Sequence, residues 1–387
     1  MITDGKPRHN RWWALAIGTG VALSPIHNQW LTNLTTNSRG EVMFFLPSFG
    51  YLLMIMGTGL FLVNNWQQIK QAGWGDRRVI GCLGFIVLAI ALSGTSAIRL
   101  QDKFAPLLTG LCLFAMYLVG RVLGKELFKP LAIGAVIASL GVIAYSILCG
   151  VQRTGGFVFE RNYDIFTGYA MLGTALFISS YQWTTAGLAL AALFLSGSPE
   201  MLLPILVSGI TAIARKDWSK KLGIILVPLV ILVAVLFATG LGQQLFNHTM
   251  KIVRGEHTVE FTMDSGREVS ESPITWRLDT IKRAMTNIKP LGEGYNLTGF
   301  TYDTVHNVPL ILVQQMGYPG ILAALAWLYI SIYCLFKTKW KYAWLLILSL
   351  SVFDHFIWTQ TAPVWWAVVG ASTAGGIKSD LIFRRVK

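Results

Sequence analysis

The stretch HNVPLILVQQMGYPGILAALAWLYISIYCLF, residues 306–336, decides the fold of this chain. It contains no Asp, Glu, Lys or Arg, and a run of about 20 apolar residues can cross the hydrocarbon core of a bilayer. A Gly-Tyr-Pro-Gly segment at 317–320 interrupts the run, and the 18 residues from Pro319 to Phe336 still suffice to span. We therefore predict a separate half-helix over 308–316, because non-helical backbone at membrane depth is tolerated beside protein or a water-filled cavity.

Composition places the whole chain in the same class. It is 53% hydrophobic and 13% charged, with 14 Trp in 387 residues, which is typical of a polytopic membrane protein. We predict an all-α fold, a polytopic transmembrane helical bundle of about 12 spans that forms one domain over residues 1–387. The predicted spans are 12–30, 42–63, 79–98, 104–120, 130–150, 165–180, 182–197, 200–214, 222–241, 308–336, 342–358 and 361–377. The alternative is about ten spans, with 182–214 forming one kinked hairpin.

Charge orients the predicted bundle. With the N-terminus inside, the inner segments, including Arg121, hold 20 basic and 5 acidic residues, a net charge of +15. The outer segments hold 12 basic and 14 acidic residues, a net charge of −2. Cytoplasmic loops retain Lys and Arg, so both termini are predicted to be cytoplasmic. The net charge of +13 then reflects topology, and we expect no nucleic-acid partner.

Residues 242–307 form the predicted large outer loop, and loops of this length are usually functional or disordered. The loop contains an ordered element, because Ser272 and Pro273 are typical of an N-cap and a first helical residue. An apolar stripe follows at helical spacing and ends before Pro290; it consists of Ile274, Leu278, Ile281, Met285 and Ile288. An amphipathic helix of this kind lies on the bilayer surface or against the bundle. Arg277 on its flank could bind a lipid phosphate, the alternative being simple packing.

His306 stands at the end of this loop. Pro309 lies where a helix needs no amide hydrogen, so Asn307 is predicted to be the N-cap of the half-helix. His306 is then just outside the helix and directed into an outer cavity, near the positive end of the helix dipole. The alternative is a histidine that acts only as a cap or an interfacial anchor.

The order of these motifs resembles the O-antigen ligase and O-antigen polymerase superfamily. The motifs are Trp276-Arg277, an amphipathic helix, Pro290-Leu-Gly-x-Gly-Tyr, His306-Asn307-x-x-Leu and Gly317-x-x-Gly. The segment 153–162 resembles the outer loop that precedes the middle helices of that superfamily, and the resemblance covers roughly residues 150–375. The chain departs from the pattern at Ser198-Pro199, where many members have an arginine beside the serine.

The resemblance implies an inverting glycosyl transfer that needs no metal and no cofactor. Members use polyprenyl (undecaprenyl) diphosphate-linked glycans on the outer, periplasmic face of the bacterial inner membrane. Histidine suits the general base because its ordinary pKa is about 6.5, and arginine binds phosphate through a fixed fork of donors. The implied base is His306, the implied diphosphate ligands are Arg277, Arg161 and Arg153, and supporting candidates are Asn307, Asp354, His355, Arg283 and Arg267.

Three functions remain open. A ligase would move a finished glycan to the lipid A-core in lipopolysaccharide biosynthesis. A polymerase would join lipid-linked repeat units, with the growing chain as donor. Both reactions use the same base and the same arginines. A transporter of lipid-linked glycans would instead favour internal repeats and discontinuous helices, and the sequence contains no convincing repeat.

Overall fold

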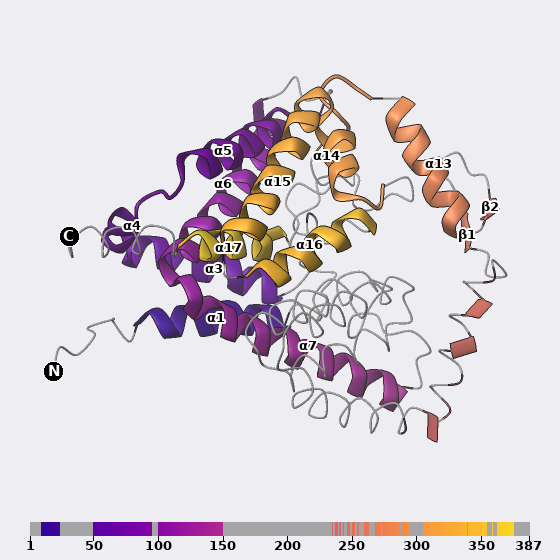
Figure 1. Ribbon diagram of the computed structural model, residues 1–387, viewed down its shortest axis with the longest axis horizontal. Coiled ribbons are helices and arrows are strands. Elements are labelled where there is room, and N and C mark those ends of the chain that lie inside the picture. Colours follow the sequence, from indigo (N-terminus) through magenta and orange to yellow (C-terminus); the bar gives the residue numbers. More distant parts are fainter. Residues whose placement is uncertain are drawn as a thin grey trace.

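The computed structural model describes residues 9–23, 49–94, 100–149, 259–262, 268–271, 273–286, 288–294, 305–338, 340–353, 358 and 362–374, with scattered positions between 234 and 254. The part of the chain so described is overwhelmingly helical, which confirms the predicted all-α class (Figure 1). Within it, one antiparallel strand pair occurs, with β1 (Val259–Thr262) beside β2 (Glu268–Glu271) in the large loop. This hairpin was not predicted.

Helices occupy the predicted spans wherever the structure describes them. They are α1 (His9–Leu23), α3 (Phe49–Asn64), α5 (Arg77–Leu92), α6 (Leu100–Leu123), α7 (Phe128–Cys149), α14 (Val308–Met316), α15 (Tyr318–Lys337), α16 (Lys341–Phe353) and α17 (Ala362–Thr373). The spans 165–180, 182–197 and 200–214 and most of 222–241 lie outside the described residues. The number of spans, the alternative at 182–214 and the departure at 198–199 therefore stay predictions.

Two short elements were missed. Helix α4 (Trp66–Ala72) follows α3 directly, and the 3₁₀ turn η1 (Gly124–Leu127) joins α6 to α7. Neither is long enough to give a membrane-span signal, and a 3₁₀ turn is a common connector between helices. Both shape the end of the bundle at which α6 finishes.

Glycines set the closest helix contacts. A Cβ atom on Gly120 of α6 would collide with the carbonyl of Ala367 in α17, and one on Gly370 would collide with the carbonyl of Tyr117. Small residues let two helix backbones approach in this way, and they are common at helix interfaces in membranes. The α6–α17 pair is therefore a tight packing unit at the centre of the bundle (Figure 1).

The bundle has two distinct ends. Gly18 faces Pro130 and Val21 faces Gly134, so α1 runs parallel to α7, which begins directly after η1. Both α1 and α17 contact η1. The start of α1 and the end of α17 thus lie at one end, which we call the η1 end.

The opposite end carries the start of α15, and we call it the α14 end. There, the backbone amide of Gly94, just after α5, donates to the carbonyl of Leu291 at 2.9 Å. At the η1 end, the hydroxyl of Tyr333 donates to Oδ2 of Asp76, the N-cap of α5, at 3.1 Å. Helices α5 and α15 therefore run antiparallel between the two ends.

Arg121, one of the basic residues counted in the inner segments, is buried within the bundle. It lies in the last turn of α6 with only 5% of its surface exposed. Its Nη1 donates to the carbonyl of Thr373 at 2.6 Å and its Nη2 to that of Ala72 at 3.0 Å. The ends of α17 and α4 supply these carbonyls, whose partial negative charge offsets the buried cation.

Within the part of the chain that the structure describes, two helical stretches are long and apolar enough to cross a membrane, Pro106–Ala138 and Tyr318–Lys337. Helix α15 has 20 residues, which extend about 30 Å at 1.5 Å per residue. One of its faces is buried, and the other exposes apolar side chains from one end to the other. These are Tyr318, Ile321, Leu322, Leu325, Leu328, Tyr329, Ile332 and Phe336.

Candidate functional site

Asn307 begins α14, as the sequence predicts. Its backbone is extended, and its side-chain oxygen accepts a hydrogen bond from the amide of Leu310 at 3.1 Å, the geometry of an N-cap. Its Nδ2 donates to the carbonyl of Val352, in the last turn of α16, at 2.9 Å. The start of the half-helix is therefore fixed to the end of a neighbouring helix.

His306 directly precedes this cap. Its side chain is half-buried, and its Nδ1 atom is buried. On its other side, Val305 is fully buried and donates its backbone amide to Oε1 of Gln314 at 3.1 Å. The histidine thus stands between two residues that are each held by a hydrogen bond to another part of the site.

The half-helix ends at a break in the backbone, where a neighbouring loop supplies hydrogen-bond partners. The backbone amides of Glu293 and Gly294 donate to the carbonyls of Gln314 and Gln315, at 2.9 and 3.0 Å. Carbonyls in the last turn of a helix have no partner within the helix. The loop 288–294 therefore caps α14. Its amides supply hydrogen-bond partners for helix carbonyls next to the interruption predicted at 317–320.

Two glycines make this cap possible. Gly317, between α14 and α15, has φ +65°, and a Cβ there would collide with the carbonyls of Lys289 and Pro290. Gly292 has φ +74°, and a Cβ there would collide with the backbone of Gln315. Only glycine adopts such backbone angles readily and allows so close an approach. The loop 288–294, which contains the Pro-Leu-Gly-x-Gly motif and which we call the seat of α14, therefore packs directly against the end of the half-helix.

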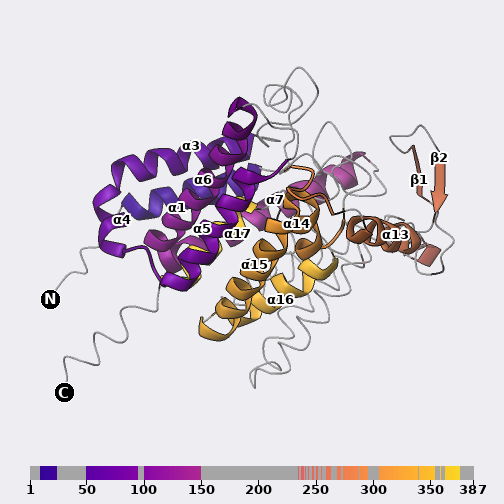
Figure 2. The ribbon, with the colours of Figure 1, turned by 90° about the horizontal axis from the view of Figure 1, so that it is seen from above.

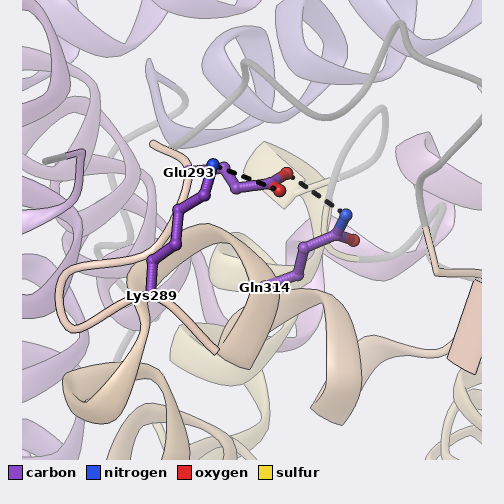
Figure 3. Close-up of polar contacts among 3 residues, drawn as sticks. All are labelled: Lys289, Glu293 and Gln314. Atoms are coloured by element: carbon purple, nitrogen blue, oxygen red, sulfur yellow. Dashed lines mark hydrogen bonds and ion pairs between the residues drawn. The ribbon is translucent and has the colours of Figure 1, made fainter. Parts of the chain in front are cut away.

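A polar contact that was not predicted from sequence joins the loop 288–294 to α14 (Figure 3). Nε2 of Gln314 donates to Oε2 of Glu293 at 3.2 Å, and Nζ of Lys289 lies 3.7 Å from Oε1 of Glu293. The signal that could have revealed it is the pair Gln314-Gln315 in an otherwise apolar half-helix. Polar residues in such a segment tend to have partners or a function.

Helix α13 (Pro273–Thr286) confirms the predicted amphipathic helix and its start at Pro273. It contacts α14 and otherwise lies at the edge of the molecule in both views (Figures 1 and 2). Its apolar stripe is only partly covered, because Leu278 is 61% and Met285 54% exposed, whereas Ile281 is half-buried. Packing against the bundle therefore accounts for only part of the stripe.

The arginines of α13 have half-buried side chains. Arg277 lies in the second turn of the helix. Arg283 lies in its last turn, where Nε donates to the carbonyl of Asp279 at 3.4 Å. The structure thus places both on the helix of the large loop that directly precedes the segment 288–294.

The remaining site candidates, Arg153, Arg161, Arg267, Asp354 and His355, lie outside the described residues, and their roles stay predictions. Helix α16 ends at Phe353, immediately before Asp354 in the sequence. Among the residues that the structure describes, no group of three or more His, Cys, Asp or Glu side chains could hold a metal ion.

The fold and the site together define a helical protein with membrane-length helices and a histidine at the start of a capped half-helix. No model of a known protein family matches the chain, and no curated protein matches it either.

Proposed function

We propose that this chain is a multi-pass membrane glycosyltransferase that moves a glycan from a polyprenyl diphosphate to a sugar hydroxyl on the outer face of the bacterial inner membrane. The observation that carries the proposal is the placement of His306 at the start of a half-helix whose beginning and end are both fixed by hydrogen bonds. A general base needs such fixed geometry, because proton transfer requires hydrogen-bond distance to the reacting group.

The membrane location is supported by the surface of the bundle. The apolar face of α15 runs along the whole helix, and its length of about 30 Å matches a hydrocarbon core. The first described helix, α1, begins at the η1 end, and the last, α17, finishes there, which favours an even number of crossings. Basic residues gather at the same end, among them Arg77, Lys125, Lys129 and Lys337, which favours a cytoplasmic η1 end. The α14 end then faces the periplasm.

The reaction follows from the chemistry of the donor. His306 takes the proton of the acceptor hydroxyl as its oxygen attacks the anomeric carbon. The bond from that carbon to the diphosphate oxygen breaks, and the polyprenyl diphosphate leaves with the electron pair. Attack from the side opposite the leaving group inverts the anomeric centre. The departing diphosphate needs no proton, so positive charge is sufficient to stabilise it.

Arg277 supplies that charge from α13, through a guanidinium fork that matches phosphate oxygens. Arg153 and Arg161 are further diphosphate ligands in this scheme, and Arg283 and Arg267 are secondary candidates. Asn307 supports the base through its cap. Asp354 and His355, which follow α16 in the sequence, support the acceptor side.

The decisive assay uses the purified protein in liposomes with an undecaprenyl-diphosphate glycan as donor. One arm offers lipid A-core as acceptor, and the other offers a second lipid-linked unit. A single product on lipid A-core identifies a ligase, and a ladder of lengthening lipid-linked chains identifies a polymerase. Movement of the lipid-linked glycan across the bilayer, with no new glycosidic bond in either arm, overturns the proposal in favour of a transporter.

Arg277 gives a sharper version of the same assay. We expect Arg277→Ala to lose transfer and Arg277→Lys to restore only part of it, because an ammonium is a point charge and not a bidentate fork. Transfer at the wild-type rate by Arg277→Lys would contradict the claim that a bidentate guanidinium binds the diphosphate. Lys282→Ala is the matched control, because Lys282 is an exposed cation on the same helix.

A further inference from the structure

The Gln314 amide can be oriented in only one way. Its oxygen lies 3.1 Å from the amide nitrogen of Val305, which can only donate, and its nitrogen lies 3.2 Å from a carboxylate oxygen of Glu293 (Figure 3). A carboxylate in its ionised form only accepts. Turning the amide over would place two donors together and two acceptors together, so both contacts depend on one orientation.

The pair is doubly tied. In addition to the side-chain contact, the backbone amide of Glu293 donates to the carbonyl of Gln314 at 2.9 Å. Glu293 therefore cannot move away from Gln314 without breaking the cap of α14. A chain of contacts then runs from the seat of the half-helix through Gln314 to Val305.

This chain ends one residue before His306. Val305 is held by Gln314, and Asn307 is held by Val352 and Leu310. The backbone of His306 is thus fixed from both sides, by α14 at Val305 and by both α14 and α16 at Asn307. Loss of the contact to Gln314 would remove the anchor on the Val305 side and leave the one at Asn307 in place.

We infer that Glu293 and Gln314 form a positioning pair that fixes the segment bearing His306, an inference that rests on the proposed function for its catalytic consequence. Glu293 orients the Gln314 amide, Gln314 holds the Val305 amide, and the imidazole is thereby held in place for proton transfer. Neither residue touches a reacting atom in this role. A displacement of about 1 Å at a reacting group can cost roughly a hundredfold in rate, so the effect is expected on kcat.

The chain offers an exchange test. In Gln314→Glu, two carboxylates face one another, and their repulsion turns the new side chain away from Glu293 and from the Val305 amide. The double variant Glu293→Gln/Gln314→Glu rebuilds the contact with its donor and acceptor exchanged, because the carboxylate introduced on α14 accepts both from the Val305 amide and from the side-chain amide introduced on the loop. Lys289→Ala is the matched control, because it removes only an exposed ion pair at 3.7 Å, and such pairs contribute little.

Two measurements are made on the full-length protein in liposomes. Hydrogen exchange followed by mass spectrometry reports protection of the Val305 amide and needs no activity. Steady-state transfer with undecaprenyl-diphosphate glycan reports kcat and KM. For Gln314→Glu and Gln314→Leu we expect faster exchange at Val305 and a kcat lower by about tenfold to a hundredfold, with KM little changed. The double variant restores both readouts, and Lys289→Ala leaves both unchanged.

The outcomes separate this inference from the proposed function. Unchanged exchange at Val305 in Gln314→Leu, or a double variant no better than Gln314→Glu, overturns the positioning pair. Restored exchange protection without restored kcat also overturns it, because the pair would then serve stability alone. If the wild-type protein transfers no glycan, the proposed function fails, and the exchange results still decide whether the pair fixes Val305.

Discussion

The two ends of the bundle differ in how deeply the polar groups discussed above, Arg121 and His306, are buried. At the η1 end, Arg121 is 5% exposed and is held by two helix-terminal carbonyls, and the hydroxyl of Tyr117 is bound to the carbonyl of Trp74 at 2.8 Å. At the α14 end, His306 is half-buried and Glu293 is exposed. Arg121 is thus enclosed within protein at an end whose other cations, such as Lys125 and Lys129, are exposed, whereas the polar side chains of the α14 end lie at an accessible surface.

Under the proposed function, this difference in burial indicates which of the two side chains can meet a substrate. A buried cation that donates to helix-terminal carbonyls from Nη1 and Nη2 stabilises packing, because removing it would leave those carbonyls without this donor. A half-buried histidine beside a rigid cap is still able to meet a substrate. Arginine and histidine are both common functional residues, so residue type does not separate the two roles, but burial does.

The largest effect is expected for Gly317→Ala, which breaks the α14 end alone. The new Cβ would collide with the carbonyls of Lys289 and Pro290 at a backbone angle of φ +65°. We expect a loss of about 3 kcal/mol or more in stability and no glycan transfer. Thermal unfolding in detergent measures the loss, and hydrogen exchange shows whether it is confined to α14 and its seat.

Gly81→Ala is its control, because Gly81 lies in α5 and a Cβ there meets open space. Alanine favours a helix over glycine, so this variant should be as stable as the wild type. A Gly317→Ala protein with normal stability would contradict the tight seat described for the broken helix.

Arg121→Met tests the η1 end. The variant keeps the apolar stem but leaves the carbonyls of Ala72 and Thr373 without their donor, and we expect a loss of about 3 kcal/mol. Transfer per folded molecule should stay normal, because the α14 end is untouched. Unfolding curves and folded-protein yield measure the change, with the exposed Lys129→Met as control. Lost activity in a fully folded variant would show that this end takes part in function.

Asn307→Ala has the smallest expected effect on stability, about 1 kcal/mol, the usual contribution of an N-cap. Its effect on transfer should be larger than its effect on unfolding, since the anchor to Val352 is lost as well. Asn307→Asp separates the two contacts, because aspartate keeps the cap but cannot donate to Val352. Equal transfer in the aspartate variant and the wild type would assign no role to the Val352 contact.

Much of the fold follows from local signals. The helix break at Gly317, the N-cap at Asn307 and the start of α13 at Pro273 were all predicted, because each depends on residues a few positions apart. Tertiary contacts were not predictable in this way. Arg121 has the sequence context of a flanking loop residue, but its partner Thr373 lies 252 positions away.

The same distinction between local signals and tertiary contacts applies to the residues of the site. His306 and Asn307 were found from sequence because they stand together at a helix start. Glu293 and Gln314 were missed, since they are 21 positions apart and meet only through the cap of the broken helix. The partial exposure of Leu278 and Met285 also depends on how α13 meets the bundle, which periodicity alone cannot give.

The most direct test of the central claim is the transfer rate of His306→Ala in liposomes, expressed per folded molecule and compared with the wild type on the same undecaprenyl-diphosphate glycan. Loss of a general base costs roughly a hundredfold to ten-thousandfold, so we expect transfer to fall by at least a hundredfold while the unfolding temperature stays close to that of the wild type. Transfer at the wild-type rate in a folded His306→Ala protein would contradict the account.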